Sequence, residues 1–224
     1  IHYEKNEHQK AVGDLELLLK KFPKTGFKSS AIQLKGKIYM ASNQLDKAIK
    51  EFRDGLTISG QSEDGEIMLM NLANAEAERK QYDKALGLYR EFQEKFPNSK
   101  RMERVVYEKG WILMQKGSPA DAELVFTTYK SKYPKGKYIS DVEFALGEIA
   151  YDKKDYSRAF GHYEKCGQKH KDKALYKGGW CKFKLEKFKD AATSFKQLVD
   201  QFPDSAVRIE SIYRAGLSFM MAND

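Results

Sequence analysis

One pattern recurs along the chain with a nearly constant spacing. An alanine is followed four residues later by a large apolar side chain, and in four of six copies a proline stands twelve residues after the alanine. Successive alanines are 37 residues apart four times and 32 residues apart once. The six alanines are Ala11, Ala48, Ala85, Ala122, Ala159 and Ala191. Self-similarity at a fixed period of this size indicates repeated structural units, so it constrains the fold before any single element does.

A second set of small residues runs alongside the alanines. Each follows the preceding alanine by 25 residues, except Gly179, which follows Ala159 by 20. The set is Gly36, Ala73, Gly110, Gly147, Gly179 and Gly216. Two helices per repeat explain both sets, because small residues let two backbones approach and the large side chain after each alanine fills the space beside them. The five residues missing before Gly179 predict a shortened connection near residues 166–173.

The five prolines agree with this division into helices. Pro119 follows Ser118 and precedes Asp121, which predicts a helix that begins at Pro119 with Ser118 as its N-cap. The other four stand where the second helix of a repeat should end, because proline cannot continue the hydrogen-bond ladder of a helix. They are Pro23, Pro97, Pro134 and Pro203.

One helix pair cannot bury its apolar face alone, whereas stacked pairs can, so the repeats predict a solenoid with contacts between neighbouring pairs. We expect an all-α fold of about twelve helices, with five complete pairs and an unpaired helix at each end. These helices would form a single elongated domain over residues 1–224. The chain starts with Ile1 and begins and ends in mid-pattern, which predicts a fragment of a longer protein.

The pattern resembles the tetratricopeptide repeat, in which Leu-Gly and Tyr precede Ala, an aromatic residue four positions on, and Pro. Two segments carry it clearly: residues 138–165 with Leu146-Gly147, Ala159 and Tyr163, and residues 34–52 with Gly36, Tyr39, Ala48 and Phe52. The resemblance covers essentially the whole chain, but the period is 37 instead of about 34 and no repeat has the first Trp. It implies a right-handed α-α superhelix that acts as a non-enzymatic scaffold for protein–protein interaction.

The longer period and the endings KFPNS (95–99) and QFPDS (201–205) resemble repeats of bacterial outer-membrane assembly lipoproteins and Tol-Pal-associated coiled-coil proteins. Residues 174–205 also resemble repeats of bacterial envelope and gliding-motility proteins and the superhelix of soluble lytic transglycosylases. This branch implies a scaffold in a bacterial envelope or motility complex, with a periplasmic or envelope-associated location. The alternatives are an accessory superhelical domain of a peptidoglycan-cleaving enzyme and a homo-oligomerising structural module.

The resemblance also places the concave surface, which the first helix of each repeat lines in this family. The inward positions would lie three before, one after and four after each small residue, and these rows hold both tryptophans. Aromatic and methionine side chains give large, adaptable contact areas, so we expect a groove for an apolar or amphipathic segment of another protein. The alternative is that helix packing buries these rows. The predicted groove residues are Met70, Asn74, Tyr107, Trp111, Met114, Phe144, Glu148, Tyr151, Tyr176, Trp180, Phe183 and Tyr213.

Some members of this family hold a C-terminal carboxylate with Lys and Asn side chains. Asn71 and Asn74 resemble part of that clamp, but Met70 stands where a lysine would be needed, so we expect no carboxylate clamp. The last helix, within residues 205–222, has no partner helix to cover its apolar side chains, which predicts a possible contact between two copies. These side chains are Ile212, Leu217, Phe219 and Met220.

The charge pattern argues against a nucleic-acid partner, and the absence of known motifs argues against catalysis. The net charge is +8, with 40 Lys and Arg against 32 Asp and Glu, and acids alternate with bases, which indicates a solvated surface and no nucleic-acid partner. No catalytic or nucleotide-binding motif occurs, so we expect no enzyme activity, cofactor or metal. No apolar run is long enough to insert into a membrane.

The two cysteines predict buried free thiols: Cys166 is expected on the inner face of its helix, and Cys181 in the next helix. The histidines are scattered: His2, His8, His162 and His170.

Overall fold

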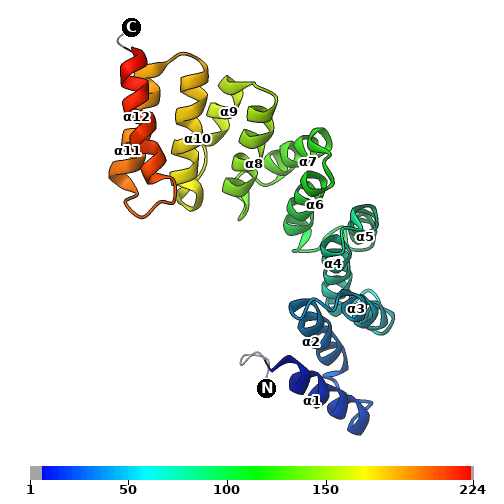
Figure 1. The fold of residues 1–224 in the computed structure, drawn as a ribbon. Coiled ribbons are helices and arrows are strands. Elements are labelled where there is room, and N and C mark those ends of the chain that lie inside the picture. Colours follow the sequence, from blue (N-terminus) through cyan, green and yellow to red (C-terminus); the bar gives the residue numbers. More distant parts are fainter. Residues whose placement is uncertain (1–6, 223–224) are drawn as a thin grey trace. The chain divides into compact units, whose positions relative to one another are not determined.

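The computed structural model describes residues 7–222, and within this range the regular elements are helices (Figure 1). Twelve of them are α-helices, as the repeat predicts, and a short 3-10 helix, η2 (Gln168–His170), precedes α10. The first helices of the repeats are α2 (Lys28–Ala41), α4 (Glu63–Glu78), α6 (Met102–Lys116), α8 (Ile139–Asp152), α10 (Lys171–Lys184) and α12 (Arg208–Ala222). The second helices are α1 (His8–Lys21), α3 (Leu45–Ser59), α5 (Tyr82–Lys95), α7 (Pro119–Lys132), α9 (Tyr156–Tyr163) and α11 (Phe188–Gln201).

The chain divides into two compact units, Ile1–Ser118 with α1 to α6 and Pro119–Asp224 with α7 to α12. Within each unit, a helix packs mainly against the helix before it and the helix after it in the chain. This nearest-neighbour pattern is the one expected of stacked helix pairs, in which each repeat buries its apolar face against the next. His2 and Ile1 lie outside the described residues.

The prolines end helices as predicted. Each of four prolines stands two residues beyond the last residue of α1, α5, α7 or α11. The residue before a proline is sterically driven out of the helical region, and Phe96, before Pro97, has φ −129° and ψ 55°. Phe22 and Phe202 have nearly the same backbone angles. The fifth proline, Pro119, is the first residue of α7, where its missing N–H costs no helical hydrogen bond.

Glycines of first helices lie directly against aromatic rings of second helices. A Cβ atom at Gly36 would lie 2.3 Å from Cε1 of Phe52, closer than any real Cβ contact. Only glycine therefore lets the ring reach the backbone at this point. The same contact would be 2.6 Å and 2.8 Å in two pairs of the second unit, Gly147 with Tyr163 and Gly179 with Phe195. The predicted roles of the small and the aromatic positions are thus confirmed in these pairs.

The repeat with the 32-residue spacing differs from its prediction. Its second helix, α9, has eight residues, whereas the other second helices have 14 or 15. The prediction of a shortened connection is therefore wrong, because the missing residues come from the helix. The chain leaves the helix after Tyr163 and docks onto α8, where the Gly167 N–H donates a 2.8 Å hydrogen bond to Ser140 Oγ.

The two cysteines are buried free thiols, as predicted. Cys181 lies in α10 and is fully buried. Cys166 is also buried, but it stands three residues beyond the end of α9 and not on a helix, so its predicted placement is wrong. The early end of α9 explains this difference.

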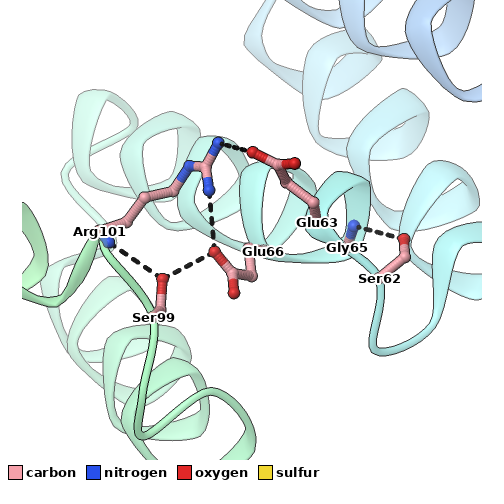
Figure 2. A network of polar contacts seen from close by, with 6 residues as sticks. All are labelled: Ser62, Glu63, Gly65, Glu66, Ser99 and Arg101. Atoms are coloured by element: carbon pink, nitrogen blue, oxygen red, sulfur yellow. Dashed lines mark hydrogen bonds and ion pairs between the residues drawn. The ribbon is translucent and has the colours of Figure 1, made fainter.

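Polar contacts tie the start of one first helix to the turn that leads into the next (Figure 2). Glu66, in the first turn of α4, accepts hydrogen bonds from Ser99 Oγ at 2.7 Å and from Arg101 Nη1 at 2.9 Å. Arg101 also binds Glu63 at 2.8 Å. The Ser99 hydroxyl in turn accepts the Arg101 N–H at 3.0 Å, which fixes the turn itself.

The second unit repeats this contact. Ser205 Oγ donates a 2.8 Å hydrogen bond to Asp172 Oδ2 in the first turn of α10. Asp172 stands seven residues before Gly179, as Glu66 stands seven before Ala73. The contact therefore occurs in both units, and in each it links neighbouring repeats in the way a solenoid requires.

Candidate functional site

A groove of about 620 Å³ lies in the first unit, against three successive first helices. Met40 comes from α2, Ala77 from α4, and Trp111 and Ile112 from α6, and together they give it an apolar lining. Asn74, also on α4, lines the same groove. Asn74 and Trp111 are predicted groove residues, and the fold brings them together although they stand 37 residues apart in the sequence.

The lining residues are held in place by their neighbours. Tyr89, a buried residue of α5, donates a 2.5 Å hydrogen bond to Asn74 Oδ1. Tyr89 is fully buried, and burial raises the pKa of its phenol, so the hydroxyl stays protonated and remains a donor. The ring of Tyr107 lies edge-on to Trp111, with centroids 6.2 Å apart. A positioned amide and a positioned indole make the groove pre-formed, which lowers the ordering cost of binding.

Two of the three charged residues that line the groove are acidic, although the chain as a whole is basic. Glu78 from α4, Glu108 from α6 and Lys80 line it together with Tyr82 and Gln115. Burial raises the pKa of Glu78, and none of the ion pairs in the described part of the chain includes this residue. Glu108 accepts a 3.2 Å hydrogen bond from Arg104 on its own helix.

The remaining predicted residues of the first unit behave differently from Asn74 and Trp111. Met70 is only 5% exposed and belongs to the same apolar cluster as Tyr89 and Phe92. It is therefore a core residue, and its prediction as a groove residue is corrected. In this repeat, the position three residues before the small residue packs against the second helix, and Met70 is buried for this reason. Tyr107 and Met114 are half-buried and flank the lining.

In the second unit, the predicted residues of α10 form a row of half-buried rings, Tyr176, Trp180 and Phe183, which we call the α10 aromatic row. The centroids of Tyr176 and Trp180 are 6.4 Å apart, and those of Trp180 and Phe183 are 5.7 Å apart. The guanidinium carbon of Arg214, from α12, lies 4.5 Å from the Trp180 ring centroid. This cation–π contact covers part of the row, and next to it the predicted residue Tyr213 is exposed.

On α8, the predicted residues are tied into contacts within the second unit. Glu148 accepts hydrogen bonds from the Tyr163 hydroxyl at 2.5 Å and from Lys177 Nζ at 3.0 Å. The Lys177 ammonium lies 5.3 Å from the ring centroid of Tyr151. Phe144 stacks on the imidazole of His170 at 5.1 Å. The predicted residues of α8 therefore already have contact partners within the second unit.

Sequence reasoning missed most of the rim of the groove in the first unit. Glu78 and Gln115 both stand five residues after a small residue of the repeat, Ala73 and Gly110. Glu108 stands two before Gly110. A fourth row at the position five after the small residue would have found two of these three residues.

No group of three or more His, Cys, Asp or Glu side chains in residues 7–222 is arranged to hold a metal ion. In the same range, no helix has both the length and the apolar character of a membrane span. What the groove provides is an apolar surface with a few polar groups, an arrangement suited to binding a side chain or a short segment.

Two protein-family models match the chain, each described as a tetratricopeptide repeat, one over residues 34–100 and the other over residues 173–205. No curated protein sequence matches. Among solved structures, PilW, described as a widely conserved type IV pilus biogenesis factor, is 18% identical with a TM-score of 0.69. That match covers 94% of this chain and 93% of PilW. PilF of Pseudomonas aeruginosa is 20% identical with a TM-score of 0.65, over 93% of this chain and 90% of PilF.

YrrB, described as a tetratricopeptide-repeat protein with an unusual peptide-binding site, is 13% identical with a TM-score of 0.61, over 89% of this chain and 99% of YrrB. The chain also matches a chain of the APC/C hetero-tetramer Cut9–Hcn1, with 17% identity and a TM-score of 0.57. It spans only 41% of that chain's length. At these identities the likeness concerns the fold, and the fold is the all-α superhelix that the repeats predict.

Proposed function

Because the chain is a tetratricopeptide-repeat protein, we propose that it is a non-catalytic scaffold that holds a segment of another protein in the groove of the first unit. Proteins of this kind generally bind protein or peptide partners. The observation that carries the proposal is the groove of about 620 Å³, in which Asn74 and Trp111 meet on an apolar lining. Its volume falls within the range of about 300–1,000 Å³ typical of binding pockets.

The partner segment would place an apolar side chain against Trp111 and Met40. Tryptophan is enriched among the residues that dominate binding energy, because its large ring loses little conformational entropy when it is covered. The α10 aromatic row is proposed as a second contact surface, together with the half-buried rings Phe144 and Tyr151 of α8 and the exposed ring of Tyr213 on α12.

The test is capture of partners from a native extract by the chain, by Trp111→Ala, by Trp180→Ala and by the double variant. We expect a specific partner to be lost or strongly reduced in the double variant while far-UV circular dichroism stays unchanged. Gln115→Arg tests the groove of the first unit independently of Trp111. Gln115 is exposed, so its replacement by Arg blocks the groove without disturbing the core. A partner that all four variants still capture would contradict the proposal.

We place this scaffold in a bacterial envelope or motility complex. The repeat endings described above and the likeness to PilW, whose description names type IV pilus biogenesis, support this setting. Fractionation of native cells tests it, with the protein expected in the envelope or periplasmic fraction. Recovery from the cytosol alone would contradict the setting and leave the groove proposal standing. A catalytic domain in the same polypeptide would instead favour the accessory-domain alternative.

A second candidate function, contact between two copies through α12, is favoured by one observation. The helix exposes several large apolar side chains, namely Ile209, Ile212, Phe219, Met220 and Met221, while Leu217 is half-buried. A surface of this kind on one helix is typical of an interface. Light scattering of the chain beside Ile212→Glu/Phe219→Glu tests it. A dimer that the substitutions dissociate would support the contact, and a monomer at all concentrations would exclude it.

A further inference from the structure

We infer that the groove of the first unit selects a partner segment in which a lysine or arginine stands beside an apolar side chain. This inference rests on the proposed function, since it names the chemistry of the segment that the groove takes. Two observations carry it: the apolar lining, and the carboxylates at the rim, of which Glu78 has no ion-pair partner among residues 7–222.

The apolar lining fixes one side chain of the segment. Met40, Ala77, Trp111 and Ile112 come from three different helices and all face the groove. An apolar side chain that enters there removes both its own surface and theirs from water, which is favourable in proportion to the area buried. The indole of Trp111 also presents a π-face, to which a neighbouring cation of the segment is attracted.

The carboxylates fix the charge of the neighbouring side chain. Glu78 on α4 and Glu108 on α6 line the groove together with Lys80. Arg104 already binds Glu108 at 3.2 Å, so Glu78 is the lining carboxylate that has no ion-pair partner among residues 7–222. The Glu78 side chain is exposed, so its carboxylate can be reached by a cation of the segment. An arriving lysine or arginine would give Glu78 a partner, whereas an acidic side chain would add a further negative charge beside it.

Most of the other carboxylates of α4 have a cation partner, which Glu78 lacks. This helix carries five acidic residues and no Lys or Arg, yet most of its acids have partners within the unit. Glu66 binds Arg101 at 2.9 Å, and Glu76 lies 3.7 Å from the guanidinium of Arg53. Glu78, which faces the groove, has no such partner among residues 7–222. Three of the five carboxylates of α4 are thus paired within the unit, and Glu78, which lines the groove, is available to a cation from outside.

The experiment uses a phage-displayed library of random dodecapeptides, selected on the intact chain at low ionic strength. Enriched peptides are synthesised and titrated against the chain, against Glu78→Gln/Glu108→Gln, against Trp111→Ala and against Gln115→Arg. The control is Asp54→Asn/Glu94→Gln, which removes two exposed carboxylates of the same unit that do not line the groove. Circular dichroism verifies that each variant is folded.

We expect enriched peptides to carry Lys or Arg next to a large apolar residue. Binding should weaken about tenfold in Glu78→Gln/Glu108→Gln, remain unchanged in the control, and weaken in the same proportion when the peptide cation is replaced by Met. The two losses should not add, because both remove one interaction. Rising salt should weaken binding to the chain more than binding to the double variant.

Two results would overturn the inference in distinguishable ways. Peptides that need Trp111 but carry no cation, and bind the double variant equally well, would refute the charge selection and leave the groove proposal standing. Peptides that bind Trp111→Ala and Gln115→Arg undiminished would refute the groove itself. Failure to enrich any peptide would count against both.

Discussion

The hydroxyl of Tyr89, a core residue of α5, lies 2.5 Å from Oδ1 of Asn74 and donates a hydrogen bond to it across the repeat. The second unit has the same link, from Tyr163 to Glu148 at 2.5 Å. In both repeats the acceptor stands one residue after the small residue and the donor four after the alanine. The aromatic position that fills the core thus also orients a side chain on the predicted binding face.

The residues at these two positions match in three of the repeats. Where the residue four after the alanine is Tyr, the residue one after the small residue is a hydrogen-bond acceptor, Asn74 or Glu148. Where the residue four after the alanine is Phe195, the residue one after the small residue is Trp180, and their ring centroids lie 6.3 Å apart. A hydroxyl buried beside an indole face would have no acceptor there, whereas a Phe ring packs edge-on against it.

Tyr89→Phe should remove the hydrogen bond to Asn74 and leave the packing unchanged. We expect a loss of about 1 kcal/mol in the free energy of unfolding, the usual contribution of such a bond. Partner binding in the groove should also weaken, because Asn74 loses its fixed orientation. Urea unfolding followed by circular dichroism measures the first effect. An unchanged midpoint would show that the Tyr89 hydroxyl does not stabilise the repeat.

Gly36→Ala should destabilise the protein although alanine is the better helix former. The added methyl would lie 2.3 Å from the Phe52 ring, and overpacking of this kind costs about 1–3 kcal/mol. Gly87→Ala is the matched control, since Gly87 is in the interior of α5 and no atom lies within 4 Å of its Cβ position. That substitution should stabilise by up to about 1 kcal/mol. Changes of the same sign in thermal unfolding would contradict this account of the repeat.

Asp141→Asn should destabilise the second unit at neutral pH and reduce its sensitivity to acid. Burial opposes ionisation of Asp141, but hydrogen bonds from Lys169 at 2.6 Å and His170 at 2.7 Å outweigh it and hold the pKa of the carboxyl below its ordinary value. Since the unfolded value is about 3.9, this stabilisation is complete above about pH 4 and is lost as the pH falls through the lower folded value.

The measurement for Asp141 is urea unfolding of the chain and of Asp141→Asn at neutral pH and below pH 4. We expect a difference of about 1–3 kcal/mol at neutral pH, in the range of hydrogen bonds to charged groups, and a smaller one in acid. A difference that stays constant between the two pH values would mean that the ionised form of Asp141 contributes nothing.

Cys166 and Cys181 should not react with thiol reagents while the protein is folded. Both are buried, and burial raises the pKa of each thiol to about 12, so almost no thiolate exists at pH 8. Ellman's reagent should titrate both only after urea is added. Rapid labelling of the native protein would show that the α9–α10 region opens readily.

The period and the helix pairs were predictable from the sequence because the packing itself is periodic. Gly36 and Phe52 must meet wherever two helices cross this closely, and the pattern of small and aromatic residues records that contact directly. The length of α9 was not predictable, because five missing residues shorten a helix or a loop equally well. Which one shortens depends on tertiary contacts such as Gly167 with Ser140.

The groove was predictable only in part. Helical phase places Asn74 and Trp111 on one face, but phase alone cannot separate a half-buried position from a buried one, and Met70 is therefore in the core. The carboxylates of Glu78 and Glu108 were missed because the chain is basic as a whole, and a local acidic rim becomes visible only when three helices are placed side by side.

The most direct test of the central claim is site-specific photocrosslinking in native cells. A benzophenone amino acid is placed at Gln115, which lines the groove, or at the exposed position Glu94 on α5, which does not. We predict a discrete crosslinked partner from position 115 that disappears when Trp111→Ala is added, and none from position 94. The same adducts from both positions, or an adduct at 115 that Trp111→Ala leaves unchanged, would contradict a binding groove in the first unit.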